Sequence, residues 1–287
     1  MPVYQGETYL PAQIESILEQ TYPHFRLYIR DDGSTDSTLK IVQEYAQEDT
    51  RIVLITDNVG RLGTTGSIKV LLEKVRENVV FFADQDDVWA YRKIQIMLGK
   101  IPDDGLSEVP VVVFSDLEVV DRDMNMISSS FWNISGIDPS RLKFYDIISR
   151  NCVTGCAAAI NRSMLELIRK MPGSAVHDWW AGCLAAHVGV LIPIPERLVQ
   201  YRQHDQNAIG ARERGMSRII KLGKNPLFRE KYLKQLQNSI IHLKAMLNCA
   251  QFEMSFFKKQ ALRMEIIKRS SLLFLLKQCS TFDLRSS

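Results

Sequence analysis

Residues 79–89 read VVFFADQDDVW and are the most informative stretch of the chain. An apolar, β-prone run over 79–83 ends at Asp84, Asp86 and Asp87 rather than at turn residues. Carboxylates this close repel one another unless a positive charge offsets them. Hard cations such as Mg²⁺ and Mn²⁺ bind carboxylate oxygens and keep other positions for water or substrate phosphates. The stretch therefore predicts a strand that ends in a Mn²⁺ or Mg²⁺ site facing a phosphate-bearing ligand.

Short β-branched or aromatic runs alternate with helical patterns on both sides of this stretch. Strands are predicted over 26–30, 52–56, 79–83, 111–115 and 190–193, and helices over 7–20, 37–47, 66–76, 92–100, 162–170 and 178–187. This alternation is typical of an α/β protein with a mostly parallel central sheet and flanking helices. In such sheets the ligand lies beyond the carboxyl ends of the strands.

A second group of acids follows the strand predicted over 26–30. In RLYIRDDGSTDST, residues 26–38, Asp31 and Asp32 end the strand, Gly33 permits a tight turn, and Asp36 can cap the next helix. If this strand and 79–83 are parallel neighbours, both acidic loops face one crevice. A nucleotide there could place its base or ribose on the first loop and its phosphates on the second. As an isolated motif, the first loop is more often a turn with a helix cap.

Two later segments add polar and aromatic side chains. His177-Asp178-Trp179-Trp180 opens the helix predicted over 178–187, where an Asp is usually a cap. Its two indoles either pack in the core or form a wall on which a sugar stacks, and the sequence favours neither interpretation. Residues 198–204 read LVQYRQH, an apolar strand that ends in Arg202, whose fork of donors suits phosphate, and His204, a ligand type for Mn²⁺.

Taken in order, these segments resemble the family 2 glycosyltransferases of the inverting, metal-dependent type A fold. The opening PVYQGETYLPAQIESILEQTYPHF resembles that family's first loop and helix, and DDGSTD and DQDD resemble its turn and its D-x-D motif. SDLEVVD, NCVTGC, HDWW and YRQH resemble segments of bacterial rhamnosyltransferase-like members. The resemblance covers about residues 1–210, and it is specific because separated motifs agree in order and spacing.

The resemblance implies roles for individual residues. It implies nucleotide contacts from Pro2, Tyr4 and Glu7 near the nucleoside, Asp32 on the base, Asp84 near the ribose and Arg202 on the pyrophosphate. It also implies Asp86 as a metal ligand with His204 beside the metal, Asp178 as catalytic base, and Asn151, Trp179 and Trp180 as a wall around acceptor or sugar.

The implied function is a sugar transfer from a nucleotide-diphosphate donor to a hydroxyl of a saccharide or lipid-linked acceptor, in surface polysaccharide synthesis. L-Rhamnose is suggested as the sugar by the resemblance alone. One base and one metal suffice for a single displacement with inversion. Two alternatives stay open: a truncated, inactive homologue that acts as a scaffold, and a sugar nucleotidyltransferase. The latter would prefer an early Gly-rich loop with Lys or Arg for a triphosphate.

Composition is that of an ordinary globular protein, with 287 residues, 46% apolar and 24% charged. Five cysteines form an odd set without a regular framework, which favours free thiols in a reducing compartment. No signal segment opens the chain, and no uncharged run approaches the ~20 residues that cross a bilayer. We therefore expect a cytoplasmic protein, with peripheral contact to the inner face of the cell membrane as a further expectation.

Charge divides the chain into a predicted catalytic domain over 1–210 and a basic helical extension over 211–287. The first part holds 20 Lys and Arg against 28 Asp and Glu, a net −8, and the second 16 against 5, a net +11. An apolar 3–4 spacing runs through Leu233, Leu236, Ile240, Leu243, Leu247, Ala250, Met254, Phe257, Ala261 and Met264. It predicts one long helix or a helical pair that packs on the body or on a second subunit, or that lies on anionic lipid. The acidic body argues against nucleic acid as partner.

Members of the resembled family have a hydrophobic strand before the P-x-Y loop, and this chain starts inside that loop at Met1-Pro2. We expect the strands beside the missing one to have unpaired backbone groups and exposed apolar surface. Each such loss costs on the order of 1–3 kcal/mol. We therefore expect reduced stability and activity in the absence of that strand.

Overall fold

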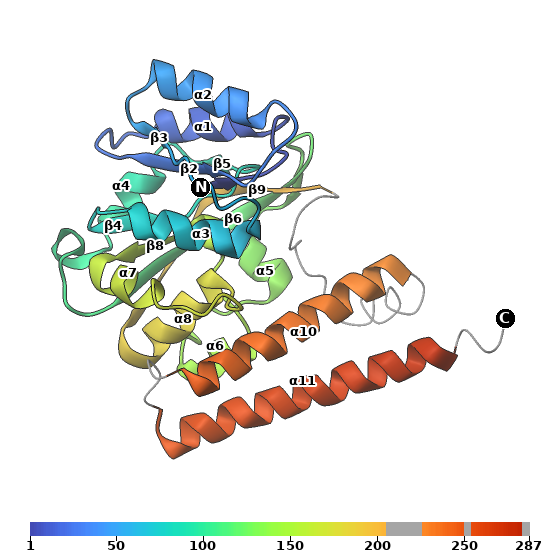
Figure 1. Ribbon diagram of the computed structural model, residues 1–287. Coiled ribbons are helices and arrows are strands. Elements are labelled where there is room, and N and C mark those ends of the chain that lie inside the picture. The colour runs from blue at the N-terminus through green and yellow to red at the C-terminus, as the bar shows by residue number, and fades with distance from the viewer. Residues whose placement is uncertain (205–225, 250–253, 283–287) are drawn as a thin grey trace.

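The computed structural model describes residues 1–204, 226–249 and 254–282. Two sheets lie at its centre and helices cover them (Figure 1). The predicted class, an α/β fold of parallel strands and flanking helices followed by C-terminal helices, is confirmed. The predicted boundary at residue 210 lies outside the described residues.

The smaller sheet is parallel and contains β1 (Pro2–Val3), β2 (Leu27–Asp31) and β3 (Ile52–Leu54), in that order. α1 (Leu10–Leu18) and α2 (Thr38–Glu48) lie together on one side of it (Figure 1), and α3 (Gly63–Lys74) follows β3. Leu10, Ile14 and Ile17 are buried on one face of α1, because their 3–4 spacing gathers them into one stripe.

The larger sheet has the order β4 (Val79–Phe81), β8 (Ala158–Asn161), β6 (Val111–Asp121), β9 (Val190–Gln203) and β5 (Val88–Trp89), with β7 (Met126–Ser128) paired to β6. β6 and β9 are parallel, whereas the other pairs are antiparallel. Residues 111–114 are at most 1% exposed, as expected of a strand buried on both faces.

Shorter elements connect these strands and cover the larger sheet. They are α4 (Lys93–Leu98), α5 (Phe131–Ser135), α6 (Phe144–Ser149), α7 (Arg162–Ile168), α8 (His177–Val188) and the 3-10 turns Pro102–Gly105 and Gly155–Ala157. The predicted helices agree with the observed ones to within a few residues at each end. Strands predicted over 111–115 and 190–193 are much longer in the structure, since β6 and β9 pair with each other along most of their length.

The condition under which both acidic loops were expected to face one crevice is not met: the strands that carry them, β2 and β4, are not paired neighbours. β2 pairs with β1 only at Arg30 and Asp31, and the one partner of β4 among the described residues is β8. A cavity of about 900 Å³ lies between their edges, lined largely by apolar side chains such as Leu27, Leu72 and Phe81. We call this space the β2–β4 slot.

The backbone of β1 leads into the β2–β4 slot. Met1 lines the slot, and its amine donates a hydrogen bond to the Tyr28 carbonyl oxygen at 2.7 Å. Burial lowers the pKa of this amine to about 5. The two sheets are therefore held together here by helix packing and loop contacts rather than by a continuous ladder of backbone hydrogen bonds.

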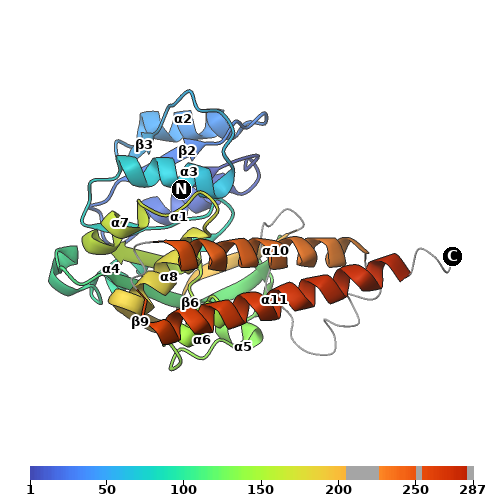
Figure 2. The same cartoon turned by 60° about the horizontal axis from the view of Figure 1, so that its bottom comes forward.

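The basic extension forms a pair of helices, α10 (Pro226–Asn248) and α11 (Phe256–Phe282), which we call the C-terminal hairpin. Both views show the two helices side by side along the part of the body that contains α6 (Figures 1 and 2). The buried apolar residues include Leu236, Ile240, Leu243 and Met254, as the spacing predicted. Met264 is instead 64% exposed, and Ala250 lies outside the described residues.

Packing of the C-terminal hairpin on the body is therefore confirmed. None of the helices in the described ranges has the length and apolar character to cross a bilayer. Cys152, Cys156 and Cys183 are buried free thiols, in agreement with the sequence.

Candidate active site

The first loop connects the two acidic loops. Tyr4 N donates to Gln85 Oε1 at 2.7 Å, and Gln85 Nε2 donates back to the Tyr4 carbonyl oxygen at 2.9 Å. On the other side, Thr35 N donates to Gln5 Oε1 at 2.6 Å. A Cβ at Gly6 would lie 2.6 Å from Gln85 Oε1, so a larger residue there would displace the Gln85 side chain from these hydrogen bonds. The two acidic loops therefore meet across the first loop although their strands do not pair.

Glu7 holds the start of α2. Its carboxylate Oε2 accepts from Ser37 N at 2.9 Å, and its own N–H donates to Asp36 Oδ2 at 3.2 Å. Asp36 in turn accepts from Thr38 N at 3.1 Å, which gives it the predicted capping role. Pro2 lies in β1. The nucleoside contacts of Pro2 and Glu7 stay predictions.

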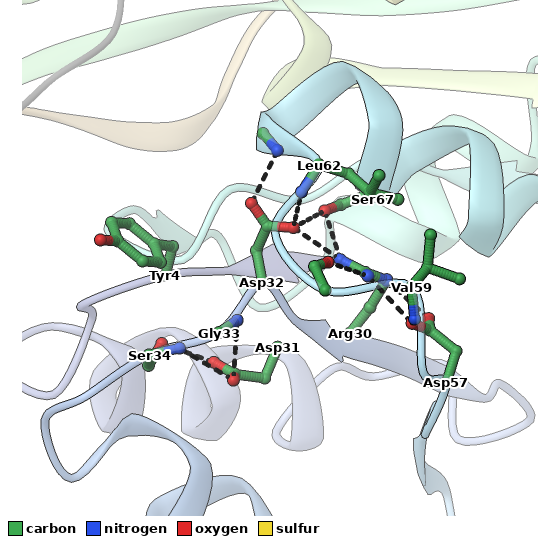
Figure 3. A network of polar contacts seen from close by, with 12 residues as sticks. Tyr4, Arg30, Asp31, Asp32, Gly33, Ser34, Asp57, Val59, Leu62 and Ser67 are labelled. Atoms are coloured by element: carbon green, nitrogen blue, oxygen red, sulfur yellow. Dashed lines mark hydrogen bonds and ion pairs between the residues drawn. The ribbon is translucent and has the colours of Figure 1, made fainter.

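Asp32 is 3% exposed and points toward the beginning of α3 (Figure 3). Its Oδ1 accepts from Arg30 Nη1 at 2.7 Å and from Leu62 N at 2.8 Å, and its Oδ2 accepts from Gly63 N at 2.7 Å. Burial alone would raise the pKa of Asp32, but hydrogen bonds led by those from Leu62 and Ser67 lower it. A nucleobase would have to share this carboxylate with protein donors, and its base contact stays a prediction.

Arg30 is the centre of this network, and the sequence did not single it out. The guanidinium is 2% exposed, and its Nε donates to Asp57 Oδ2 at 2.7 Å and its Nη2 to the Gly60 carbonyl oxygen at 2.8 Å (Figure 3). The loop between β3 and α3 is thereby fixed against the end of β2. Gly33 has φ of +86°, as its predicted tight turn requires.

Tyr4 carries a second arginine on its ring. The Arg61 guanidinium carbon lies 4.0 Å from the ring centroid, in cation–π contact. The side chain of Arg61 is exposed, so the Tyr4 ring lies at the edge of the site. At this edge a ligand can take the place of Arg61 on the ring. No local pattern in the sequence marked this arginine.

The acidic loop after β4 combines buried and accessible carboxylates. Asp87 is fully buried and its Oδ1 accepts from Arg202 N at 3.1 Å. Asp86 Oδ2 lies 2.8 Å from His204 Nε2. Asp84 is half-buried, and burial, followed by the charges of Asp86 and Asp178, raises its pKa to about 7.

The end of β9 brings two predicted residues against this loop. Arg202 Nε donates to the Asp86 carbonyl oxygen at 2.8 Å, and its guanidinium lies 4.6 Å from the Tyr9 ring centroid. The His204 ring lies 4.9 Å from that same ring. Because Arg202 is 5% exposed, its contact with a pyrophosphate stays a prediction that would require this guanidinium to share its donors.

Lys93 is a buried cation that sequence reasoning missed. Its Nζ donates to the Cys156 carbonyl oxygen and lies 3.6 Å from the Trp89 ring centroid. Burial lowers the pKa of Lys93 to about 7, opposed by the charge of nearby Asp87. The surrounding sequence reads as an ordinary helix start, which hid this role.

The donor set of the loop fits a divalent cation. Asp86 and His204 lie together as predicted, and ligand atoms of Asp84, Asp87 and Cys156 lie within 4.8 Å of one another deeper in the protein. Burial raises the pKa of the Cys156 thiol well above its usual value, so a thiolate is disfavoured there. Carboxylate oxygens are therefore the main ligands on offer, which suits Mg²⁺ or Mn²⁺.

Asp178 lies in the first turn of α8 and belongs to the same site. Its Oδ1 accepts from Asn151 Nδ2 at 3.1 Å and from its neighbour Trp179 N at 2.6 Å, and its Oδ2 accepts from Gly155 N at 3.1 Å. The ring of His177, its neighbour in α8, lies 5.0 Å from the Phe82 ring and lines the same cavity as Asp84, so the start of α8 faces the end of β4. With one protein donor among the described residues, Oδ2 retains capacity for a further hydrogen bond.

The wall predicted from the two tryptophans is not present. Trp180 is fully buried and Trp179 is 6% exposed, with its Nε1 donating to the Ile147 carbonyl oxygen at 2.7 Å. Both indoles therefore belong to the core, which was the alternative prediction. Asn151, in contrast, does lie at the site through its bond to Asp178.

The fold is that of the nucleotide-sugar transferases. More particularly, the chain belongs to glycosyl transferase family 2, whose family model matches residues 1–169.

Relatives and solved structures agree with this assignment. The dTDP-rhamnosyl transferase RfbG of Shigella flexneri is 26% identical over 252 residues, covering 82% of each chain. The UDP-Glc:alpha-D-GlcNAc-diphosphoundecaprenol beta-1,3-glucosyltransferase WfgD of Escherichia coli is 28% identical over 167 residues, 58% of this chain and 60% of that enzyme. S. aureus TarS 1-349 in complex with UDP-GlcNAc has a TM-score of 0.60 at 16% identity, covering 93% of this chain and 70% of that one.

A fourth similar protein was solved with a metal. The mannosyltransferase PcManGT from Pyrobaculum calidifontis, in complex with GDP-Man and Mn²⁺, has a TM-score of 0.52 at 16% identity, covering 99% of this chain and 79% of that one. At 16% identity, the similarity to these two solved structures supports a shared fold alone.

Proposed function

We propose that the chain transfers a sugar from a nucleoside-diphosphate donor to a hydroxyl of a saccharide or lipid-linked acceptor, with inversion at the anomeric carbon. The observation that carries this proposal is the position of Asp178 at the start of α8, where its neighbour His177 lines the same cavity as Asp84, with the Asp86–His204 pair on the same acidic loop. A carboxylate with capacity for a further hydrogen bond thus faces a loop of carboxylates suited to a cation. The family match lends no support to the nucleotidyltransferase alternative.

In the proposed step, Asp178 Oδ2 accepts the proton of the acceptor hydroxyl while that oxygen forms a bond to the anomeric carbon. The bond from this carbon to the donor's diphosphate oxygen breaks, and the nucleoside diphosphate leaves with the electron pair. Asn151 and Gly155 hold the carboxylate in place through the hydrogen bonds given above. Inversion follows because the attack and the departure occur on opposite faces.

Asp86 and His204 are proposed to hold Mn²⁺ or Mg²⁺, with Asp84 beside them. Such an ion would supply charge stabilisation for the diphosphate leaving group. The first loop, with Pro2, Tyr4 and Glu7, and Asp32 are proposed to face the nucleoside. Arg202 is proposed to contact the pyrophosphate.

The donor sugar is proposed from similarity. The similarity to RfbG of Shigella flexneri, a dTDP-rhamnosyl transferase, covers 82% of each chain, so dTDP-rhamnose is the first donor to test. WfgD of Escherichia coli makes UDP-Glc the second.

Contact with the inner membrane surface is proposed through α11. Its outward side chains include Lys259, Arg263 and Lys268 together with Met264 and Ile267, the last two 64% and 58% exposed. No acid is exposed among the side chains described over 258–273. Each such cation contributes about 1 kcal/mol near an anionic lipid surface, which would suit a lipid-linked acceptor.

A panel of nucleotide sugars, assayed for Mn²⁺-dependent release of nucleoside diphosphate, tests the proposal. Asp178→Asn should lower turnover by about 100-fold or more, the size expected for a general base. Asp86→Asn should lower turnover as well, because it removes a proposed ligand of the ion that would stabilise the leaving group. Glu48→Gln, which removes an exposed charge on α2, is the matched control and should behave as wild type. Full turnover in Asp178→Asn would refute the assignment of the base.

A further inference from the structure

The C-terminal hairpin reaches the helix that carries Asp178. His242 of α10 is fully buried, and its ring stacks on Trp179 with centroids 4.3 Å apart and an interplanar angle of 6°. Its Nδ1 accepts from Val176 N at 3.1 Å, at the residue that precedes α8. One side chain of α10 thus contacts both the backbone before α8 and the indole next to Asp178.

Arg269 of α11 approaches the same indole. Its guanidinium carbon lies 5.1 Å from the Trp179 ring centroid, in cation–π contact. Its Nη2 donates to the Ser149 carbonyl oxygen at 2.7 Å, and its Nε donates to Glu265 Oε1 at 2.8 Å. The guanidinium is therefore fixed by α6 and by its own helix while it contacts Trp179.

Trp179 transmits these contacts to the proposed base. Its indole Nε1 is bonded to the Ile147 carbonyl oxygen, and its backbone N–H donates to Asp178 Oδ1. Holding the indole restrains the Trp179 backbone, and with it the N–H that donates to Asp178 Oδ1 at 2.6 Å. Burial, followed by the charge of Arg269, lowers the pKa of His242 to about 3, so the stacked imidazole is neutral at ordinary pH.

We propose that His242 and Arg269 are positioning residues that hold Asp178 in place for catalysis, through Trp179 and the start of α8. This inference rests on the proposed function. It makes the C-terminal hairpin a part of the catalytic unit, although none of its residues touches the reacting atoms.

His242→Ala and Arg269→Ala test the proposal in the full chain. Displacement of a catalytic group by about 1 Å can cost on the order of 100-fold in rate, so we expect kcat to fall by about 10- to 100-fold. KM for the donor should change by less than about twofold, because the residues proposed to bind it lie on other elements. His242→Phe keeps an aromatic ring on Trp179 and should recover most of the loss. Lys244→Ala, exposed on α10, is the matched control.

A double-mutant cycle separates positioning from a general loss of structure. In an Asp178→Asn background, His242→Ala should have no further effect on kcat, since the group that it positions is already absent. An equal loss in both backgrounds would overturn the inference, as would wild-type kcat in both alanine variants. Full activity of Asp178→Asn would instead sink the proposed function itself. Thermal melting of each variant, monitored by near-UV circular dichroism, verifies that the protein assayed is folded.

Discussion

Replacing Asp84 by asparagine should stabilise the metal-free protein while it removes activity. The pKa of Asp84 rises from 3.8 to about 7 in the folded chain, chiefly through burial. The folded state then holds a proton that the unfolded state releases between about pH 4 and pH 7. Stability is lost as the pH rises through this window, and the penalty persists above it.

The size of the effect follows from the shift in pKa. A shift of about 3 units corresponds to about 4 kcal/mol at 1.36 kcal/mol per unit. Since Asp84 is half-buried and water can screen part of its charge, we expect a gain of about 1–2 kcal/mol for Asp84→Asn at pH 8. At pH 4 the gain should vanish, because the native carboxyl is then protonated as well.

Urea unfolding of wild type, Asp84→Asn and the control Glu48→Gln, in chelator at pH 4, 5.5 and 8, measures this difference. Added Mn²⁺ should raise the midpoint of wild type more than that of Asp84→Asn, and the variant should release little nucleoside diphosphate. A lower midpoint for Asp84→Asn than for wild type at pH 8 would show that the carboxylate is not strained in the metal-free protein, and the reasoning would fail.

Three other predictions concern the slot, the outer face of α11 and the thiols. About five alternating apolar residues added before Met1 should raise the thermal midpoint by filling the β2–β4 slot and pairing with its edges; a polar extension of equal length is the control, and equal midpoints would contradict the idea. Reversing Lys259, Arg263 and Lys268 to Glu should abolish co-sedimentation with anionic vesicles and leave neutral vesicles unaffected, whereas unchanged binding would count against a lipid-facing α11. Burial raises the pKa of Cys152 to about 12, so mass spectrometry should find it unalkylated by iodoacetamide at pH 8 in the folded chain and rapidly alkylated in urea.

Local patterns predicted the parts of the site that depend on few neighbours in sequence. Asp84 and Asp86 were predictable because acids that directly follow an apolar strand occupy its carboxyl end. Gly33 was predictable because its turn needs a positive φ. Asp178 at the start of a helix was likewise visible from the pattern alone, although its hydrogen bond from Asn151 joins residues far apart in the chain.

Features that depend on tertiary packing were not visible in the sequence. Lys93 reads as a surface residue of a short helix, and only the fold buries it beside Asp87. Trp179 and Trp180 suited core and wall equally, and the C-terminal hairpin decides the matter by covering them. Pro193 marked an apparent strand end, yet β9 continues to Gln203 because β6 pairs with it on both sides of that proline.

The interruption between β2 and β4 has a mechanical consequence. A continuous sheet is stiff along its hydrogen bonds. The β2–β4 slot is bridged by side chains and loops instead, so the two sheets separate there first when the molecule is deformed. Tyr4 and Asp32 lie on one side of the β2–β4 slot, and Asp178 lies on the other. The width of the β2–β4 slot therefore affects the separation between the first loop, where we propose that the nucleoside binds, and the carboxylate on α8. A ligand or segment that narrows the slot would shorten this separation.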